Sequence, residues 1–569
     1  MRALLFRNHR SLKSIFSRKF PVRTDKMDAS LVDSQTRCYM SYNSLGEPQK
    51  APVVVGKGKK ERKQRIQAVR TVIEVRDIDN SQFGDLELIQ SRYRTQREWT
   101  PVISLNEEFD SKSVWIRARI HTVRKAGAKM CFLLLRQGVS SVQALLIVNE
   151  DVLDGVSISR QMVTYASKIP PESIVDIFGT VKKTAEPVKS ATQHDVEVHV
   201  ERFFVVSASS PELPFQLDDA GRCGSDEDPF SEAKHEQHES GKEKKIVTVG
   251  RSLRLDYRWI DVRTRSKHAI FRIQSSICRY FREYFIKKDF IEIHTPKIIA
   301  GVSEGGAEVF RLKYFGKPAC LAQSPQLYKQ MAVMADLGGV FEIGPVFRAE
   351  NANTNRHLTE FVGMDFEMPI FEHYREVLEV LGNLFVFIFD NLNAHCKDEL
   401  EAVNSQYPFI PLKYRRETLI LQFADMIELI QEERKKMEAN GMSPEEIEKA
   451  GANVHPLKDF STPNEKLLGR LIKAKHDVDF YIVDRYPLAA RPFYTMPAPD
   501  DPNYTNSYDV FLRGEEITSG AQRIHDPAML EQRAKEKDIP VPSIQSYIEC
   551  FKHGASPHGG AGIGLERVV

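Results

Sequence analysis

Between residues 114 and 207 the chain alternates apolar and polar positions in short runs. The runs are VWIRARIHTVR, MCFLLLRQ, VQALLIV, SIVDIFGTVKK and VEVHVERFFVVS, and polar or glycine-containing turns separate them. A two-residue period of this kind indicates β-strands with one buried face. A helical stretch near 150–167 lies between the third and fourth runs. This order predicts a small five-stranded barrel of the OB-fold type, which we assign to residues 101–212.

A different pattern begins after residue 250. Long amphipathic stretches with the 3.6-residue period of helices alternate with apolar runs of strand length, up to residue 569. We therefore expect a large α+β domain over 251–569, with surface helices at 414–450 and 464–475. Residues 213–250 separate the two domains, and nine acidic residues lie within 216–245. Their composition predicts a hinge or acidic linker.

The first 100 residues form two polar segments. Residues 1–56 have no periodicity, and the first 24 contain seven Lys or Arg and no acidic residue. This composition is typical of a mitochondrial presequence, and the alternatives are a disordered basic tail or a true start at Met27. Residues 57–100 begin with a Lys-rich run, which is either a solvated charged face or a non-specific contact for phosphates.

Composition narrows the class of protein only a little. The length of 569 residues requires more than one domain, and 80 basic against 78 acidic residues argue against a histone-like polyanion binder. Seven scattered cysteines without a CxxC pair indicate a reducing, intracellular compartment. We find no apolar stretch long enough for a bilayer and expect no membrane partner.

The candidate chemistry begins with one long helix and a pair of strands. The helix IFRIQSSICRYFREYFIKKDF runs into the strand IEIHTPKIIAG, a pattern that is also common in plain cores. The stretch VFEIGPVFRAENANTNRHLTEFVGMDFEM then delivers Arg348 and Glu350 from one strand, and Phe361, Asp365 and Glu367 on the next. Charged groups in apolar strands need partners or ligands, and an arginine fork fits phosphate oxygens.

The last stretch, GGAGIGLERVV, leads from glycines into a helix that carries Arg567. It has neither the P-loop nor the dinucleotide-binding spacing. In this order the three stretches resemble motifs 1, 2 and 3 of the class II aminoacyl-tRNA synthetases. The connecting segments SEGGAEVF, LAQSPQLYKQ, GMDFEM and YDVFLRGEEITSGAQR resemble the aspartyl-tRNA synthetases of the eukaryotic cytosolic and archaeal type, and this resemblance extends from Val114 to Val569.

The resemblance implies an antiparallel-sheet catalytic domain of the α+β class preceded by an OB-fold anticodon-binding domain. It also implies ATP-dependent activation of L-aspartate to aspartyl-adenylate, followed by transfer of the aspartyl group to tRNA(Asp). Positioning and charge neutralisation can carry such a reaction without a protein nucleophile. The residues implied as catalytic are Arg348 at the α-phosphate, Arg567 at the γ-phosphate, and Glu516.

The same resemblance implies the ligands of ATP and Mg²⁺. The ATP-binding residues are Arg348, Glu350, Arg356, His357, Leu358, Phe361, Glu516, Gly564, Leu565, Glu566 and Arg567. The Mg²⁺ ligands are Asp509, Glu516 and Ser519. Mg²⁺ prefers hard oxygen ligands of this kind, completed by substrate phosphates.

For L-aspartate, the implied binding residues are Glu304, Gln326, Lys329, Asp365, Ser519 and Arg523. Lys329 and Arg523 would hold the side-chain carboxylate. Asparagine would then leave both cations buried without a counter-charge, at a cost on the order of 3–5 kcal/mol per broken pair. In the barrel, Phe132 would stack on an anticodon base, Gln143 and Glu197 would read bases, and Arg124 would reach a phosphate or a base.

Partners and location also follow from the resemblance. Motif 1 forms a two-fold interface in this family, so we expect a homodimer, with other synthetases as further candidate partners. The segment 57–100 would be a Lys-rich RNA-binding appendage, and the location would be cytoplasmic rather than mitochondrial. Relatives continue beyond the helix that follows motif 3, so we expect the domain that ends at Val569 to be cut short. The alternatives are an asparaginyl-tRNA synthetase or a catalytically compromised synthetase-like RNA-binding protein.

Overall fold

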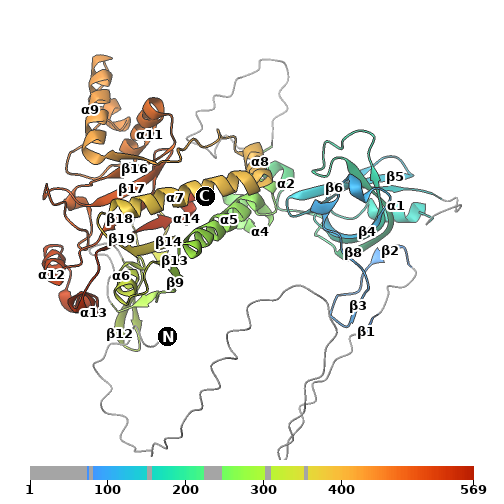
Figure 1. The fold of residues 1–569 in the computed structure, drawn as a ribbon. Coiled ribbons are helices and arrows are strands. Elements are labelled where there is room, and N and C mark those ends of the chain that lie inside the picture. Colours follow the sequence, from blue (N-terminus) through green and yellow to red (C-terminus); the bar gives the residue numbers. More distant parts are fainter. Residues whose placement is uncertain (1–73, 76–80, 150–156, 223–246, 301–308, 351–356) are drawn as a thin grey trace, which may run out of the picture. The chain divides into compact units, whose positions relative to one another are not determined.

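The computed structural model describes residues 74–75, 81–149, 157–222, 247–300, 309–350 and 357–569 (Figure 1). Two short strands, β1 (Glu74–Val75) and β3 (Tyr93–Arg94), pair in parallel and belong to a separate unit of residues 1–75 and 92–94. The predictions for 1–56 and for the Lys-rich run lie outside the described residues.

The predicted barrel is present. Its strands follow the predicted runs closely: β4 (Ser113–Lys125), β5 (Met130–Gln137), β6 (Ser140–Ile147), β7 (Ile174–Lys183) and β8 (Val196–Ser207). Pairing of β7 with both β4 and β8 closes the sheet, and α1 (Arg160–Ala166) lies between β6 and β7 in sequence. Alternate residues such as Ile116 and Leu133 fill the interior. The structure adds one strand, β2 (Phe83–Asp85), parallel to β8.

The second domain is built on one eight-stranded sheet with the order β15-β16-β17-β18-β19-β14-β13-β9. All neighbours are antiparallel except β13–β9 and β15–β16. The strands are β9 (Ile291–Glu292), β13 (Val340–Phe347), β14 (Glu360–Pro369), β15 (Leu419–Gln422), β16 (Phe480–Asp484), β17 (Ser507–Leu512), β18 (Glu515–Gln522) and β19 (His558–Gly564). The predicted α+β class with an antiparallel sheet is confirmed.

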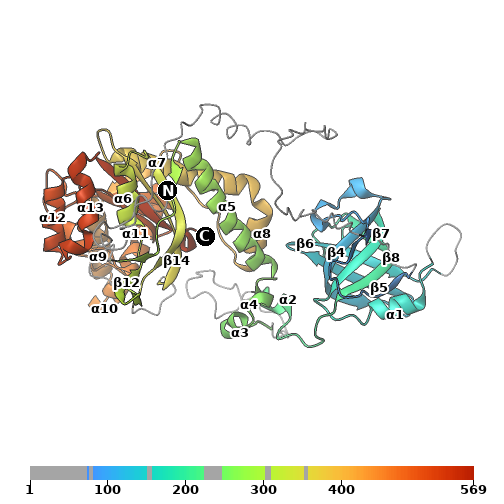
Figure 2. The same cartoon turned by 90° about the horizontal axis from the view of Figure 1, so that it is seen from below.

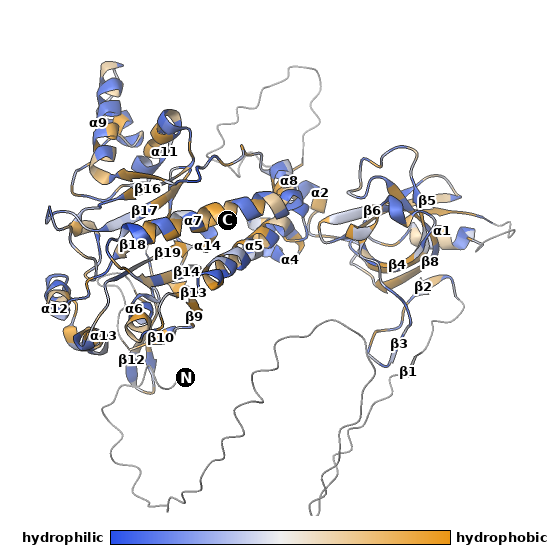
Figure 3. Ribbon diagram, viewed as in Figure 1, coloured by the Kyte–Doolittle hydropathy of each residue, from blue (hydrophilic) through white to orange (hydrophobic). Residues whose placement is uncertain are grey.

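Two long helices, α5 (Arg265–Lys287) and α7 (Arg375–His395), lie side by side and share one core with the sheet (Figures 1 and 2). Phe281 of α5, Phe385 of α7 and Phe366 of β14 are fully buried in it. By length and composition alone α7 could cross a membrane, but Glu376, Glu379 and Asp390 interrupt its apolar residues and half of its most apolar stretch is buried. Polar and apolar residues are mixed along α7 (Figure 3), and apolar ones pack into this core.

Shorter elements complete the second domain. They are α2 (Leu217–Ala220), α3 (Arg251–Asp256), α4 (Arg258–Asp261), α6 (Gln326–Met334), α8 (Lys397–Gln406), α9 (Phe423–Ala439), α10 (Pro444–Lys449), α11 (Thr462–His476), α12 (Pro527–Glu536), α13 (Gln545–Cys550) and α14 (Leu565–Val568). A small sheet joins β10 (Ile298–Ile299), β12 (Lys317–Leu321) and β11 (Arg311–Tyr314).

Two predicted segments differ in detail from the structure. The expected helical segment 414–450 contains the strand β15 and then two helices, α9 and α10, because Gly441 has a positive φ of 79° and Ser443 caps a new helix at Pro444. The expected linker contains the helix α2, whose Leu217 and Ala220 bury against Ile260. Residues 223–246 of that linker lie outside the described residues.

Candidate active site

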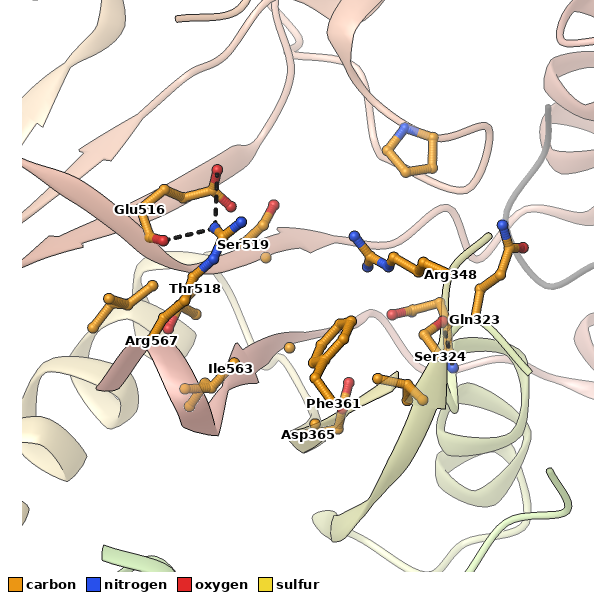
Figure 4. Close-up of a pocket in the computed structure, with 18 of the residues that line it drawn as sticks. Gln323, Ser324, Arg348, Phe361, Asp365, Glu516, Thr518, Ser519, Ile563 and Arg567 are labelled. Atoms are coloured by element: carbon orange, nitrogen blue, oxygen red, sulfur yellow. Dashed lines mark hydrogen bonds and ion pairs between the residues drawn. The ribbon is translucent and has the colours of Figure 1, made fainter. Parts of the chain in front are cut away.

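A cavity of about 400 Å³ opens over the middle strands of the large sheet. The strands β14, β18 and β19 supply much of its walls, and Gln323 and Ser324, which precede α6, and the loop at 490–495 add to them. In Figure 4, Arg567 and Glu516 lie on one side of this cavity and Arg348 on the other, with Phe361 between them. The cavity therefore gathers residues from motifs 2 and 3 that are about 200 positions apart in the chain.

The motif 2 side of the cavity carries a cation, an aromatic ring and a carboxylate. The Arg348 guanidinium lies 5.5 Å from the centre of the Phe361 ring, and its Nη1 is 4.0 Å from Oε1 of Glu350. His357 Nε2 lies 3.7 Å from Glu350 Oε2. Leu358 stands at the rim and is 43% exposed. These residues bring together a planar cation and an aromatic ring, and their contact with ATP stays a prediction.

The motif 3 side pairs Arg567 with Glu516. Arg567 Nη1 donates a hydrogen bond of 2.8 Å to the carbonyl oxygen of Glu516 and lies 4.0 Å from its carboxylate Oε2. Burial and then the neighbouring Asp509 raise the pKa of Glu516 to about 8, although Arg567 opposes this. Gly564 and Glu566 line the same side, whereas Leu565 is buried in the core beneath it.

Beside the predicted metal ligands Asp509 and Ser519 lies Arg491, which the sequence did not identify. Arg491 Nη2 donates to Asp509 Oδ2 at 2.7 Å, and its Nη1 donates to Ser519 Oγ at 3.1 Å. Burial, followed by the charge of Asp509, raises the pKa of Asp459, which also lines the cavity. Acidic groups and one arginine therefore share this corner. Among the described residues, no set of three His, Cys, Asp or Glu side chains could hold a metal ion by itself.

A chain of buried ion pairs lies at and beneath the floor of the cavity, where Asp365 and Arg523 line it and Lys329 and Glu367 do not. Lys329 Nζ lies 2.9 Å from Asp365 Oδ1 and 3.5 Å from Glu367 Oε2. Arg523 Nε donates to Glu367 Oε1 at 2.9 Å, and its Nη2 donates to Oε2 at 3.3 Å. Burial alone would raise the pKa of Glu367, but Arg523 and Lys329 together hold it below its usual value. Burial raises the pKa of Asp365 despite Lys329.

These contacts correct one expectation. We expected Lys329 and Arg523 to be without counter-charges unless aspartate is bound, but Asp365 and Glu367 neutralise both in the structure. The sequence pointed to Glu367 only as a charge in an apolar strand. Gln326 lines the cavity, and its Nε2 is buried without a hydrogen-bond partner among the described residues. Glu304 and Arg356 lie outside the described residues.

The predicted anticodon residues lie together on the barrel. Arg124 and Phe132 are paired residues of β4 and β5, and the guanidinium lies 4.6 Å from the ring centre. Gln143 Nε2 donates to Glu197 Oε2 at 2.8 Å. His199, which sequence analysis missed, lies with Nε2 2.9 Å from the other oxygen of Glu197. The hydrogen bond with His199, followed by that from Gln143, keeps the pKa of Glu197 low.

Comparisons with known proteins agree with this arrangement. Residues 250–569 match the family described as tRNA synthetases class II (D, K and N), and residues 114–206 match the OB-fold nucleic acid binding domain. The human protein named aspartate–tRNA ligase, cytoplasmic, is 48% identical over 493 residues, which are 87% of this chain and 91% of that protein.

Solved structures give the same result. An aspartyl-tRNA synthetase from Entamoeba histolytica has a TM-score of 0.73 and 43% identity, over 91% of this chain and 95% of that one. An asparaginyl-tRNA synthetase from Pyrococcus horikoshii has a TM-score of 0.65 and only 26% identity, over 83% and 94%. The chain therefore belongs to the aspartate–tRNA ligase family of the class II tRNA synthetases.

Proposed function

We propose that this chain activates L-aspartate with ATP and transfers the aspartyl group to tRNA(Asp). One observation carries the proposal: a single cavity is lined by Arg348 and Arg567 at its walls and by Arg523 and Asp365, two members of buried ion pairs, at its floor. Arg348 and Arg567 can neutralise the phosphates of ATP from two sides, and Phe361 can support the adenine ring. Fixed charges in a site that excludes water stabilise the charge that develops in such a transfer.

The floor of the cavity suits an amino acid with an acidic side chain. Arg523 can turn part of its fork to a ligand carboxylate while Glu367 holds the rest, and Lys329 adds a second positive charge nearby. Asp365 can accept hydrogen bonds from the ammonium group, and the unpartnered Nε2 of Gln326 can donate to a carboxylate oxygen of the ligand. Glu304 and Ser519 stay predicted aspartate ligands. Selectivity for a carboxylate over an amide then comes from the hydrogen-bond donors of Arg523 and Lys329 rather than from cations without counter-charges.

The corner at Asp509 fits a divalent metal ion that ATP helps to bind. Oδ1 of Asp509 is buried without a hydrogen-bond partner among the described residues, Glu516 is a further carboxylate candidate, and Ser519 pairs with Asp509 in the sheet. Mg²⁺ commonly takes one or two carboxylates and completes its shell with phosphates and water. When bound, it supplies charge neutralisation for the phosphates.

For tRNA, we propose the barrel surface around Phe132 as the anticodon contact. Stacking of a base on such a ring contributes about 1–3 kcal/mol. Arg124 covers one face of the ring, so a base would lie against the other face or against the guanidinium. Gln143 and Glu197 form a hydrogen-bonded pair, which would bind the edges of the bases. The Lys-rich segment 57–100 would add salt-sensitive contacts to phosphates.

We also propose a homodimer in the cytoplasm. Apolar side chains of α5 and the following strands are unusually exposed, with Phe271 at 49%, Ile286 at 61%, Ile291 at 44% and Ile298 at 54%. Large exposed apolar patches commonly mark protein interfaces. Two further points stay predictions. They are membership of a complex with other synthetases and the domain borders at 57, 101, 213 and 251.

The test is ATP–pyrophosphate exchange measured separately with aspartate and asparagine, followed by charging of tRNA(Asp). Exchange with aspartate alone, and charging of that tRNA, would support the proposal. Exchange with asparagine alone would favour the asparaginyl alternative, which has the lower identity in the comparison above. Exchange with neither amino acid, in the presence of tRNA binding, would favour the catalytically compromised RNA-binding alternative.

A further inference from the structure

Arg491 is a buried arginine that lines the cavity, and neither the motifs nor the proposed substrates account for it. It follows a short 3₁₀ turn (Leu488–Ala490) and is only 8% exposed. Its guanidinium lies 4.0 Å from the centre of the Tyr486 ring, which fixes its plane. A buried cation of this kind is costly unless carboxylates and hydrogen-bond acceptors surround it.

The partners of Arg491 come from two neighbouring strands. Asp509 of β17 and Ser519 of β18 face each other in the register of the sheet. Arg491 spans this pair, with Nη2 on Asp509 Oδ2 at 2.7 Å and Nη1 on Ser519 Oγ at 3.1 Å. An ammonium group could not reach both acceptors with the same fixed geometry, because only the planar fork of arginine holds two donors in parallel.

The contact leaves one oxygen of Asp509 without a partner. Oδ1 of Asp509 and Nε of Arg491 are both buried and have no hydrogen-bond partner within the described part of the chain. An uncompensated carboxylate oxygen is destabilising in a buried site, and a cation would remove that cost. The other carboxylates that face this corner are Asp459 and Glu516, and Arg567 is the second cation. Glu465 accepts a hydrogen bond from the backbone N–H of Glu516.

We propose that Arg491 is a positioning residue of the metal site, which binds one oxygen of Asp509 and the hydroxyl of Ser519 so that Oδ1 of Asp509 is directed to a divalent cation. The inference rests on the metal site proposed above. It assigns to Arg491 a role in orientation, since its two side-chain hydrogen bonds are both with candidate metal ligands, Asp509 and Ser519. Residues that orient metal ligands typically change metal affinity by about 10–100-fold when they are replaced.

The test compares Mn²⁺ binding to the full chain and to Arg491→Lys in the presence of ATP. Electron paramagnetic resonance monitors the concentration of free Mn²⁺. Lysine keeps the charge and loses the fork, so we expect about ten-fold weaker Mn²⁺ binding. The affinity for L-aspartate, measured without ATP, should change less than the Mn²⁺ affinity, although Ser519 is also a predicted aspartate ligand. Arg485→Lys is the matched control, because Arg485 donates twice to Asp500 outside the cavity, at 2.8 Å each.

Unchanged Mn²⁺ binding by Arg491→Lys, with weakened binding by Asp509→Asn, would overturn the role of Arg491 and leave the metal site in place. Unchanged binding by Asp509→Asn would overturn both the metal site and this inference. If Arg491→Lys does not fold, Arg491→Gln provides the second variant, since it retains a donor for one of the two acceptors only. Parent-like binding by that variant would also overturn the proposal.

Discussion

Arg523 binds Glu367 through both oxygens of its carboxylate, and the two residues are 156 positions apart in the chain. Glu367 is fully buried and Arg523 nearly so. Lys329 lies 3.5 Å from the same carboxylate and 2.9 Å from Asp365, so two cations and two carboxylates neutralise one another beneath the cavity. The charges that would recognise a substrate are therefore part of the stability of the domain.

Glu367→Gln should destabilise the catalytic domain, because it leaves Arg523 buried with a neutral partner. Breaking a buried pair costs about 3–5 kcal/mol. Urea unfolding measures this as a lower free energy of unfolding. Asp500→Asn is the matched control, since it breaks the Arg485 pair at an aspartate that is 63% exposed, where we expect a change below about 1 kcal/mol. Equal effects of the two variants would contradict a stabilising role for Glu367.

Lys329→Gln should weaken aspartate binding much more than ATP binding. The substitution leaves two carboxylates and one arginine at the floor, so an incoming carboxylate meets a net negative charge. We expect the dissociation constant of L-aspartate to rise about 100-fold or more, which corresponds to roughly 3 kcal/mol. Isothermal titration calorimetry with each substrate separates the two effects. Equal losses for aspartate and ATP would count against Lys329 as part of the amino-acid site.

The elements were predictable from sequence because their signals are local. The runs MCFLLLRQ and VEVHVERFFVVS coincide with β5 and β8, since alternation along a strand directly reports its buried face. Arg348, Phe361 and Arg567 were found through motifs that resemble those of a known family. No such signal linked Glu367 to Arg523 or Arg491 to Asp509, because these ion pairs depend on the order of strands in the sheet. Arg491 also stands in a loop without periodicity, where no pattern predicts a direction for its side chain.

Phe132→Ala should weaken tRNA binding and leave amino-acid activation unchanged. Loss of one stacked base costs about 1–3 kcal/mol, or roughly 5- to 150-fold in affinity. Filter binding of tRNA(Asp), together with ATP–pyrophosphate exchange, measures both properties. Phe109→Ala is the matched control, because Phe109 is also a half-buried barrel aromatic with a cation over its ring, Lys112 at 5.2 Å. A similar loss for both variants would indicate damage to the barrel rather than removal of a base contact.

His558 should make the stability of the catalytic domain depend on pH in the mildly acidic range. It is fully buried beside Gln330, with Nε2 3.0 Å from the amide oxygen, and burial lowers its pKa to about 4. Because the folded pKa lies below the unfolded value of 6.5, the neutral ring stabilises the fold above pH 6.5, and this contribution is lost as the pH falls towards 4. Between pH 7.5 and 5 the free energy of unfolding should therefore fall by roughly 2 kcal/mol.

Urea unfolding at both pH values should show this loss in the parent chain and not in His558→Gln. The control variant His395→Gln, at an exposed histidine, should retain the loss. Parallel pH dependence of the parent and His558→Gln would show that the ring accepts a proton as readily in the folded as in the unfolded chain.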